Sequence, residues 1–178
     1  MAVRPPEEVL DAVAEAVAVG RAVADGLRWE DRHRWHLTLQ FLGPLPRLGP
    51  VVDALAAAVG ERVAFPFRLG GAGAFPTARR ARVVWIGATV GGDALVGLAG
   101  AVSAALRPVG FEPDRPLHPH LTLARRKVPG DAGPVLAALG PGDVGPAFTV
   151  GEVVLYQSRL SSQGATYSVL ERVPLGNA

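Results

Sequence analysis

The stretch His36-Leu37-Thr38-Leu39 opens a run of β-strand formers, and its pattern returns at His120-Leu121-Thr122-Leu123. Residues at positions i and i+2 of an extended strand point to the same face. Each copy therefore places one imidazole beside one hydroxyl and directs the leucines the opposite way. The two copies lie nearly half of the 178-residue chain apart. The repeat predicts two similar half-units, with a site between them that holds both histidines and both threonines.

Two imidazoles and two hydroxyls that converge suit the chemistry of a phosphodiester. Histidine titrates near neutral pH, so one ring can accept a proton from the attacking nucleophile while the other donates one to the leaving alkoxide. Threonine hydroxyls donate hydrogen bonds to anionic oxygens. We therefore expect His36 and His120 to be catalytic, and Thr38 and Thr122 to hold the phosphate. The near-symmetric pair does not say which histidine is the acid and which is the base.

A metal site is the main alternative for the histidines. His33 precedes His36 by three residues and His118 precedes His120 by two, a spacing that permits four nitrogen ligands for zinc. No cysteine and no neighbouring pair of acids completes either half, and a metal site would leave both threonines unexplained. We therefore expect no metal and no other cofactor, with His33 in a solvated turn and His118 flanking the motif.

Composition indicates a globular, soluble protein. Hydrophobic residues make up 49% of the chain, yet no apolar run approaches the length of about 18 residues needed to cross a bilayer, and the N-terminus lacks a signal-peptide pattern. We expect a cytoplasmic protein without a membrane partner, and nothing in the sequence requires more than a monomer. The pI of 9.7 accompanies a formal net charge of only +2, so the whole chain is not strongly basic.

Hydrophobic periodicity divides the chain into helices and strands. Helices are predicted at residues 7–24, 48–60, 93–109 and 134–139. Strands are predicted at residues 27–29, 36–42, 65–69, 82–90, 148–157 and 166–173 and at the second motif, with loops at 70–76, 112–116 and 158–164. The order of these elements predicts an α+β fold of two interleaved lobes.

Residues 36–43 and 119–125 resemble the two signature motifs of the two-histidine phosphoesterase superfamily, most closely those of the bacterial RNA 2′,3′-cyclic phosphodiesterases, formerly called 2′-5′ RNA ligases. Shorter stretches are similar to the same family: Arg28-Trp29, residues 73–76 and 83–87, Gly110-Phe111, and Ser158, Leu160, Gly164 and Tyr167. The resemblance implies that residues 1–178 form a single bilobal domain. Its two pseudo-symmetric lobes would each have an antiparallel sheet and flanking helices, around a central groove.

The resemblance also implies an activity, the metal-independent hydrolysis of a terminal 2′,3′-cyclic phosphate of RNA to a 2′-phosphomonoester. It implies that His36 donates a proton to the departing 3′ oxygen, that His120 is the proton acceptor that activates water, and that Thr38 and Thr122 bind the phosphate. RNA or oligonucleotide ends with a cyclic phosphate are the implied partners. Two alternatives stay open: reversible joining of RNA ends through a 2′-5′ linkage, and a nucleotide-binding module without turnover.

Further contacts with phosphate or RNA are expected from arginines. Arg125 matches a family arginine near the phosphate, but its strand parity is opposite to that of His120. It reaches the groove only if the strand ends or bulges there, and otherwise lies on the far surface. Arg79 belongs to a basic cluster at residues 79–82, and Arg125 to another at 125–127. The clusters either follow an RNA backbone or form a solvated face.

Three aromatic side chains near the motifs, Trp35, Phe41 and Phe75, are candidates for stacking on a terminal base. Phe41 shares the face of Leu37 in an extended strand, which favours packing in the core. Phe75 ends the glycine-rich segment that we expect to be a flexible loop. Phe75 is therefore the preferred candidate for stacking.

Overall fold

Helices and strands follow one another nearly as expected in the computed structural model, which describes residues 1–45, 47–112, 116–161 and 164–176. The helices are α1 (Glu7–Ala22), α2 (Gly49–Gly60), α3 (Gly92–Leu106) and α4 (Gly133–Leu139), with 3₁₀ turns η1 (Arg32–Arg34), η2 (Ala78–Arg80) and η3 (Arg107–Val109). The strands are β1 (Ala2–Val3), β2 (Arg28–Trp29), β3 (Leu37–Thr38), β4 (Phe65–Phe75), β5 (Ala81–Val90), β6 (Leu121–Gly130), β7 (Asp143–Val150), β8 (Glu152–Ser161) and β9 (Gly164–Pro174). The four predicted helices are confirmed, with no end shifted by more than three residues. Residues 113–115 of the loop predicted at 112–116, and residues 162–163 of the loop predicted at 158–164, lie outside the described residues. The loop predicted at 158–164 is wrong for residues 158–161 and 164, because the hairpin strands β8 and β9 continue through them.

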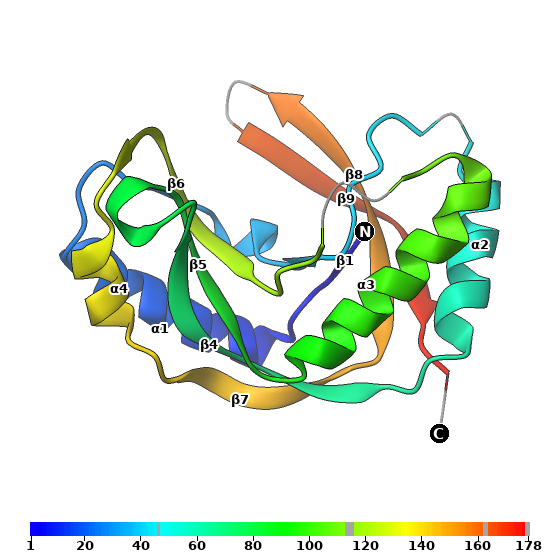
Figure 1. Ribbon diagram of the computed structural model, residues 1–178, viewed down its shortest axis with the longest axis horizontal. Helices are drawn as coiled ribbons and strands as arrows, with labels where there is room; N and C mark the ends of the chain where they lie inside the picture. Colours follow the sequence, from blue (N-terminus) through cyan, green and yellow to red (C-terminus); the bar gives the residue numbers. More distant parts are fainter. Residues whose placement is uncertain (46, 113–115, 162–163, 177–178) are drawn as a thin grey trace.

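The strands form one sheet in the order β7-β4-β5-β6-β3-β1-β8-β9, and β2 pairs with β6. Neighbouring strands are antiparallel. The sheet has two halves that meet where β6 pairs with β3. Helices α1 and α4 pack on the first half, and α2 and α3 on the second, which gives the two lobes seen in Figure 1. The predicted α+β, two-lobe fold is confirmed.

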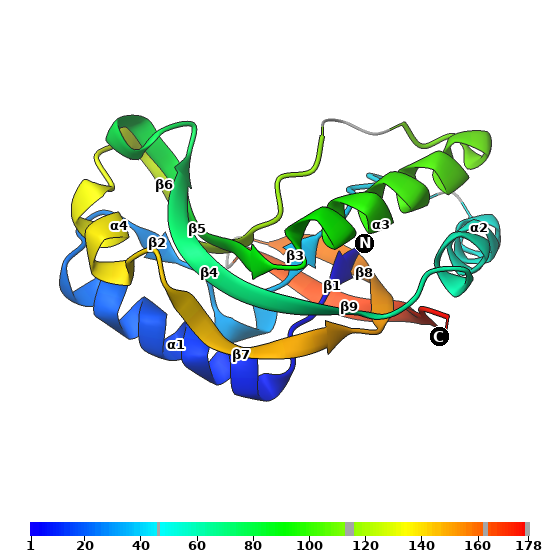
Figure 2. The ribbon, with the colours of Figure 1, turned by 60° about the horizontal axis from the view of Figure 1, so that its bottom comes forward.

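The chain crosses from one half of the sheet to the other at Gly151. Strand β7 pairs with β4 in the first half, and β8 pairs with β1 and β9 in the second. Figure 2 shows β7 running beside β4, with α1 along it. The single strand predicted over 148–157 is therefore wrong, because strand-forming residues continue on both sides of Gly151 and the sequence does not show that the chain changes partners there.

Strand β4 continues through the segment predicted to be a loop at 70–76. Its ladder with β5 is irregular between Gly70 and Ala72, and Gly71 has a φ of +70°, a conformation that side chains with a Cβ avoid. A Cβ at Gly73 would collide with the indole of Trp85. The glycines of this segment thus make a β-bulge and give room to an aromatic ring, rather than forming a flexible loop.

The strand predicted over 36–42 ends at Thr38. Its neighbour β1 is two residues long, and beyond it the N–H of Leu39 donates to the carbonyl of Met1 over 2.9 Å. After Thr38 the backbone leaves the sheet, and the alternation of faces predicted for residues 39–42 does not apply.

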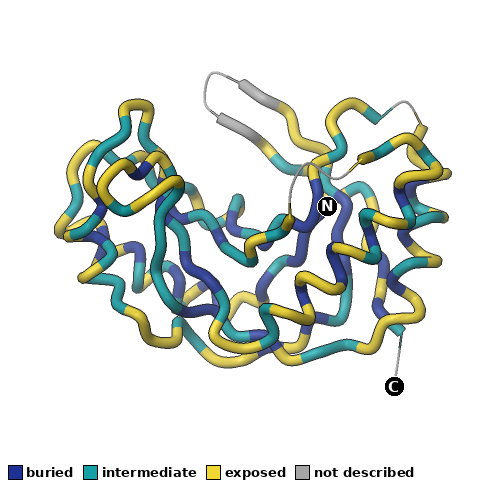
Figure 3. The backbone as a smooth tube through the Cα atoms, in the orientation of Figure 1, coloured by how far each residue is buried: buried dark blue, intermediate teal, exposed yellow. Residues whose placement is uncertain are grey.

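Apolar side chains between the sheet and the helices form the core. The central leucines of both motifs, Leu37 and Leu121, are fully buried there, and each such burial stabilises the fold by about 1.5–3 kcal/mol. Figure 3 shows buried segments in the middle of the molecule and exposed ones at its edges. With the leucines in the core, the histidines and threonines of the motifs face the other side of the sheet. No helix in the described ranges is both long and apolar enough to span a membrane.

Candidate active site

The motifs His36-Leu37-Thr38 and His120-Leu121-Thr122 lie side by side, because their central leucines pair across the antiparallel β3–β6 ladder. In such a ladder the residues on either side of a pair also face each other, in reversed order. Each histidine therefore lies opposite the threonine of the other motif. Directly opposed side chains have Cβ atoms about 4.5–5.5 Å apart. The four polar side chains form a compact group on one face.

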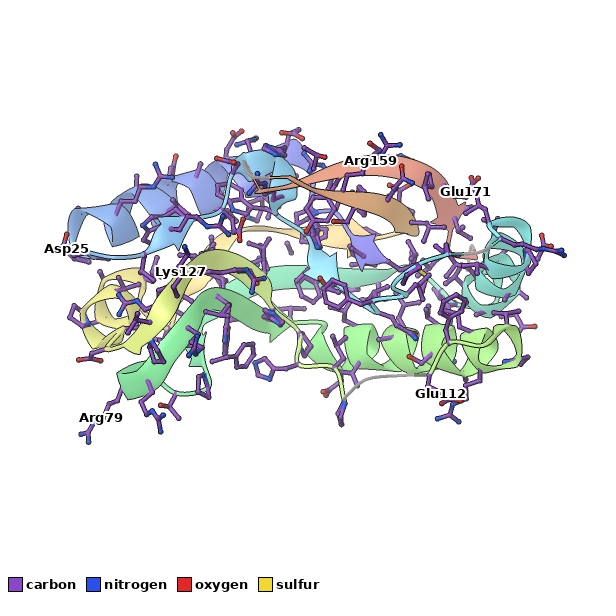
Figure 4. All side chains as sticks on the ribbon, turned by 90° about the horizontal axis from the view of Figure 1, so that it is seen from above. Asp25, Arg79, Glu112, Lys127, Arg159 and Glu171 are labelled. Atoms are coloured by element: carbon purple, nitrogen blue, oxygen red, sulfur yellow. The ribbon has the colours of Figure 1, made fainter. Side chains whose placement is uncertain are left out.

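These four side chains line a cleft with a volume of about 390 Å³, within the size range of small-molecule sites. The rest of the lining is formed by Arg28, Glu30, Arg34, Phe41, Arg125, Ser158 and Tyr167. The cleft thus brings together both predicted histidines, both predicted threonines and Arg125. Arg79 lies in η2, at one end of the molecule in Figure 4, and is not among the residues that line the cleft.

Arg125 reaches the cleft through a β-bulge. Two consecutive residues of β5 pair with residues 124 and 122 of β6, which leaves Leu123 as an extra residue. An extra residue reverses the alternation of faces, so Arg125 lies on the same side as His120. From the sequence, Arg125 was expected to reach the groove only if its strand ends or bulges, and the bulge at Leu123 fulfils this condition.

Glu30 is a cleft residue that the sequence did not single out. Its carboxylate accepts a hydrogen bond from Nε of Arg125 over 3.1 Å and lies 3.5 Å from Nη1 of Arg34. The Glu30 side chain is only 12% exposed, so solvent screens this ion pair less than one on the open surface. Glu30 therefore holds the Arg125 guanidinium by its Nε edge. The signal was its parity, since Arg28 and Glu30 are two positions apart and share a face where the chain is extended.

Backbone carbonyls orient both histidine rings. Nδ1 of His120 lies 2.7 Å from the carbonyl oxygen of His118. A carbonyl can only accept, so Nδ1 carries the hydrogen, and the neutral ring keeps a free electron pair on Nε2. His36 also makes a hydrogen bond with the backbone of Arg34, two residues before it. In both motifs the backbone two residues earlier thus helps to hold the ring.

Burial in the cleft lowers the pKa of both histidines. For His36 the pKa falls from 6.5 to about 4, chiefly through burial. The pKa of His120 is lowered for the same reason. The positive charge of Arg125 acts in the same direction on both rings. At neutral pH both rings are therefore neutral proton acceptors, until an anion in the cleft offsets burial and the charge of Arg125.

The aromatic side chains lie differently from the expectation. Phe41 is 69% exposed and lines the cleft, so its predicted packing in the core is wrong, because the strand ends before it. Trp35 is buried in the core, 3% exposed, and cannot stack on a base. Phe75 lies edge-to-face against His120, with ring centroids 5.0 Å apart, and supports that histidine without lining the cleft.

The β8–β9 hairpin supports His36 in a similar way. The ring of Tyr167 lies edge-to-face at 5.2 Å from that of His36, and Tyr156 lies at 6.0 Å. Tyr167 pairs with Ser158 across the hairpin, and both line the cleft. The sequence offered these two residues only as part of the family resemblance. Each catalytic candidate therefore rests on an aromatic ring from a different lobe.

The other histidines do not complete a metal site. In the part of the chain that the structure describes, no three residues among His, Asp and Glu are grouped closely enough to hold a metal ion. His33 is exposed in η1. The ring of His118 packs against Trp85 at 4.8 Å. The four-histidine arrangement considered from the sequence is not formed.

Comparison with known proteins gives consistent matches over most of the chain. Residues 5–161 match the model of the 2′-5′ RNA ligase superfamily. The RNA 2′,3′-cyclic phosphodiesterase of Aeropyrum pernix is 37% identical over 150 residues, which cover 78% of this chain and 81% of that protein. The enzyme of the same name from Thermus thermophilus is 36% identical over 183 residues, 96% of this chain and 86% of the relative.

Solved structures agree with these matches. A crystal structure of a protein from Thermus thermophilus aligns with a TM-score of 0.84 at 31% identity and covers 99% of this chain and 96% of that one. Escherichia coli LigT complexed with 3′-AMP aligns with a TM-score of 0.74 at 26% identity, over 98% and 95% of the two chains. The paired motifs, the two-lobe fold and these matches identify the chain as a member of the 2′-5′ RNA ligase superfamily.

Proposed function

We propose that this protein hydrolyses the terminal 2′,3′-cyclic phosphate of RNA to a 2′-phosphomonoester, without a metal ion. The proposal is carried by the pairing of the two motifs, which gathers two imidazoles and two hydroxyls in one cleft. Relatives named RNA 2′,3′-cyclic phosphodiesterase, 37% and 36% identical to this chain, support the same reaction. The complexes of LigT with 3′-AMP and with ATP support a nucleotide as the occupant of the cleft.

In the proposed reaction His120 is the general base. Its free Nε2 accepts a proton from a water molecule as the water oxygen attacks phosphorus. The bond between phosphorus and the 3′ oxygen breaks, and His36 donates a proton to that oxygen. One proton is gained by His120 and one is lost by His36, and exchange with solvent restores both rings. The phosphate remains on the 2′ oxygen.

The role of His36 as the acid requires the substrate anion. With a pKa of about 4, roughly one His36 ring in a thousand is protonated at pH 7. A phosphodiester bound in the cleft carries a negative charge, which raises the pKa of the adjacent imidazole. Thr38 and Thr122 would donate hydrogen bonds to the non-bridging oxygens, and Arg125 would stabilise the charge that develops on them. The acid is thus formed when the substrate binds.

The exposed ring of Phe41 gives the cleft a surface for the terminal base. Stacking of a base on an aromatic side chain contributes about 1–3 kcal/mol. Phe41 both lines the cleft and exposes most of its side chain, whereas Phe75 does not line it. We therefore assign to Phe41 the stacking role that was expected for Phe75.

A turnover assay tests the proposal. A dinucleotide with a 2′,3′-cyclic phosphate should be converted to the 2′-phosphate, identified by ³¹P NMR, and added chelator should change nothing. His36→Ala and His120→Ala should each lower kcat by about 10²–10⁴-fold. The matched control is His33→Ala, because His33 is exposed outside the cleft, and it should keep full activity.

Three results would contradict the proposal. Full activity in either cleft variant would exclude acid–base catalysis by the pair. A joined product, formed when a 5′-hydroxyl RNA is added, would indicate ligation in place of hydrolysis. Tight binding of the dinucleotide without any product would indicate a nucleotide-binding module.

A further inference from the structure

Positive charge is concentrated at one end of one lobe. Segments 25–30, 79–82 and 125–131 carry seven basic and three acidic side chains, a formal excess of four positive charges, whereas the whole chain has an excess of two. The rest of the chain therefore has two more acids than bases. The three segments lie together, since β2 pairs with β6 and η2 packs on β6, and Figure 4 shows Asp25, Arg79 and Lys127 at the same end. We call them the basic arm.

The cations of the basic arm are mostly without a compensating carboxylate. Elsewhere, ion pairs with acids hold Arg32, Arg68, Arg107 and Arg172. Among the described residues, no ion pair with an acid is formed by Arg28, Arg79, Arg80, Arg82 or Lys127. All five side chains are exposed. Arg47 and Arg62, which form no ion pair with a described acid either, are isolated from other basic residues in the sequence.

The basic arm continues directly from the cleft. Arg28 and Arg125 pair across the β2–β6 ladder, and both line the cleft. Lys127 follows two residues along β6, and its carbonyl accepts a hydrogen bond from Nη1 of Arg82 over 2.7 Å. The turn η2 packs beyond them. The ten residues of β6 extend at most roughly 33 Å at the usual rise per residue, which is long enough for several nucleotides.

We propose that the basic arm binds the RNA chain on the 5′ side of the cyclic phosphate, so that the protein acts on RNA ends in preference to cyclic mononucleotides. The inference rests on the proposed function, which places the reacting phosphate in the cleft. A nucleotide closed by a 2′,3′-cyclic phosphate continues only through its 5′ oxygen, so the rest of the RNA leaves the cleft on one side. Exposed cations bind successive phosphates without regard to sequence, whereas the rest of the chain carries a small net negative charge.

Two triple variants compare the basic arm with the opposite lobe. Arg79→Gln, Arg80→Gln and Lys127→Gln together remove three charges of the arm, and none of the three residues lines the cleft. The matched control, Arg47→Gln, Arg62→Gln and Arg107→Gln, removes the same charge from exposed positions around α2 and α3. The substrates are a 2′,3′-cyclic mononucleotide and a single-stranded RNA of about eight nucleotides with the same end.

The arm variant should raise the KM for the RNA on the order of tenfold at low salt, and make the slope of log KM against log salt concentration shallower by about 2. The kcat/KM of the arm variant for the mononucleotide should stay near the wild-type value. The control variant should keep both the wild-type KM for the RNA and the wild-type kcat/KM for the mononucleotide. An unchanged KM for the RNA in the arm variant would overturn the proposal, as would an equal loss in the control variant.

The failure of the proposed function has a different signature. A wild-type protein that turns over neither substrate would refute the reaction and leave the basic arm to be tested by binding alone. In that case fluorescence anisotropy with the same RNA should show about tenfold weaker binding by the arm variant than by the control. Equal binding by the two variants would overturn the inference about the arm.

Discussion

The two motif copies share their chemistry and differ in the residue that follows. Each presents a histidine and a threonine on neighbouring strands, and each ring is held by the backbone two residues earlier. Five positions after the histidine, one copy has Phe41 and the other Arg125, and both line the cleft. The repeated part suits a symmetric group such as a phosphate. The position that differs makes the two sides of the cleft unlike. We expect a nucleotide base on the side of Phe41 and the negative charge of the phosphate on the side of Arg125.

The two histidines also differ in their surroundings. His36 lies against two tyrosines of the β8–β9 hairpin, and burial lowers its pKa to about 4. His120 lies against Phe75, and burial lowers its pKa as well. A ring that is neutral until an anion arrives suits the acid of the proposed reaction, because it is charged only when a substrate is present.

Apart from the two histidines, Arg125 should cause the largest loss of kcat/KM when it is replaced. Arg125→Gln should lower kcat/KM about 10²–10³-fold, since it removes the charge that stabilises the developing oxyanion. Arg125→Lys keeps the charge but loses the Nε donor to Glu30, and its kcat/KM should lie between those of the wild type and Arg125→Gln. Steady-state kinetics on the dinucleotide measures both, and a loss below about threefold in Arg125→Gln would remove Arg125 from the proposed mechanism.

Glu30 should act through Arg125 rather than on the substrate. Glu30→Gln removes the charge of the carboxylate that accepts a hydrogen bond from Arg125, and should lower kcat about tenfold. In a protein that already carries Arg125→Gln, the same change should cost almost nothing further, because the partner is gone. Asp31→Asn is the matched control, at an exposed neighbouring carboxylate outside the cleft lining. Additive losses in the double variant would show that Glu30 acts independently of Arg125.

Phe41 and Phe75 should affect different kinetic parameters. Phe41→Ala should raise KM about five- to tenfold with little change in kcat, because a stacked base is lost. Phe75→Leu should mainly lower kcat, since its ring supports His120. Kinetics on a cyclic dinucleotide distinguishes the two effects. A higher KM for Phe75→Leu than for Phe41→Ala would restore the stacking role to Phe75.

Protein stability should depend on pH through the buried histidines, and this is the smallest of the predicted effects. Both rings have a lower pKa in the folded protein than the usual 6.5, so the unfolded chain takes up protons first as the pH falls. The contribution of His36 is complete above about pH 6.5 and is lost as the pH falls toward its folded-state pKa of about 4, and the contribution of His120 is lost in the same direction. For His36 the loss is of the order of 3 kcal/mol.

Urea unfolding between pH 8 and pH 4 measures this contribution. His36→Asn should show a shallower loss of unfolding free energy between pH 6.5 and 4 than the wild type. His33→Asn replaces an exposed histidine and should leave the profile unchanged. A wild-type profile in His36→Asn would mean that the ring is not held neutral by the fold.

The sequence predicts those parts of the site that depend only on the alternation of side chains along a strand. The His-x-Thr pattern indicated the shared face of the catalytic group, and the apolar periodicity indicated the helices. The position of Arg125 could not be derived, because it depends on the extra residue Leu123, and a bulge is set by the pairing of β6 with β5. The sequence shows that Arg125 needs a bulge or strand end to reach the cleft, but it does not show whether β6 has one.

The predictions for Phe41 and the glycine-rich segment were wrong, and Glu30 was overlooked, because all three depend on contacts between distant parts of the chain. Phe41 has the parity of a core residue, but its strand ends because β1 offers no further partner. The glycines at 70–73 have the composition of a loop, yet they serve a bulge and the packing of Trp85. Glu30 lay in a stretch interpreted as a polar turn, and its partner Arg125 is 95 positions away in the sequence. Only the folded chain brings such pairs together.

The pairing of Leu37 with Leu121 joins the two halves of the sheet and also sets the spacing of the catalytic group. A rotation of one lobe against the other would shear this junction and separate the histidines from the threonines opposite them. A motion of the lobes that keeps the catalytic candidates together must therefore leave this junction in place. In the proposed reaction, the rest of a long RNA would lie outside this junction, along the basic arm.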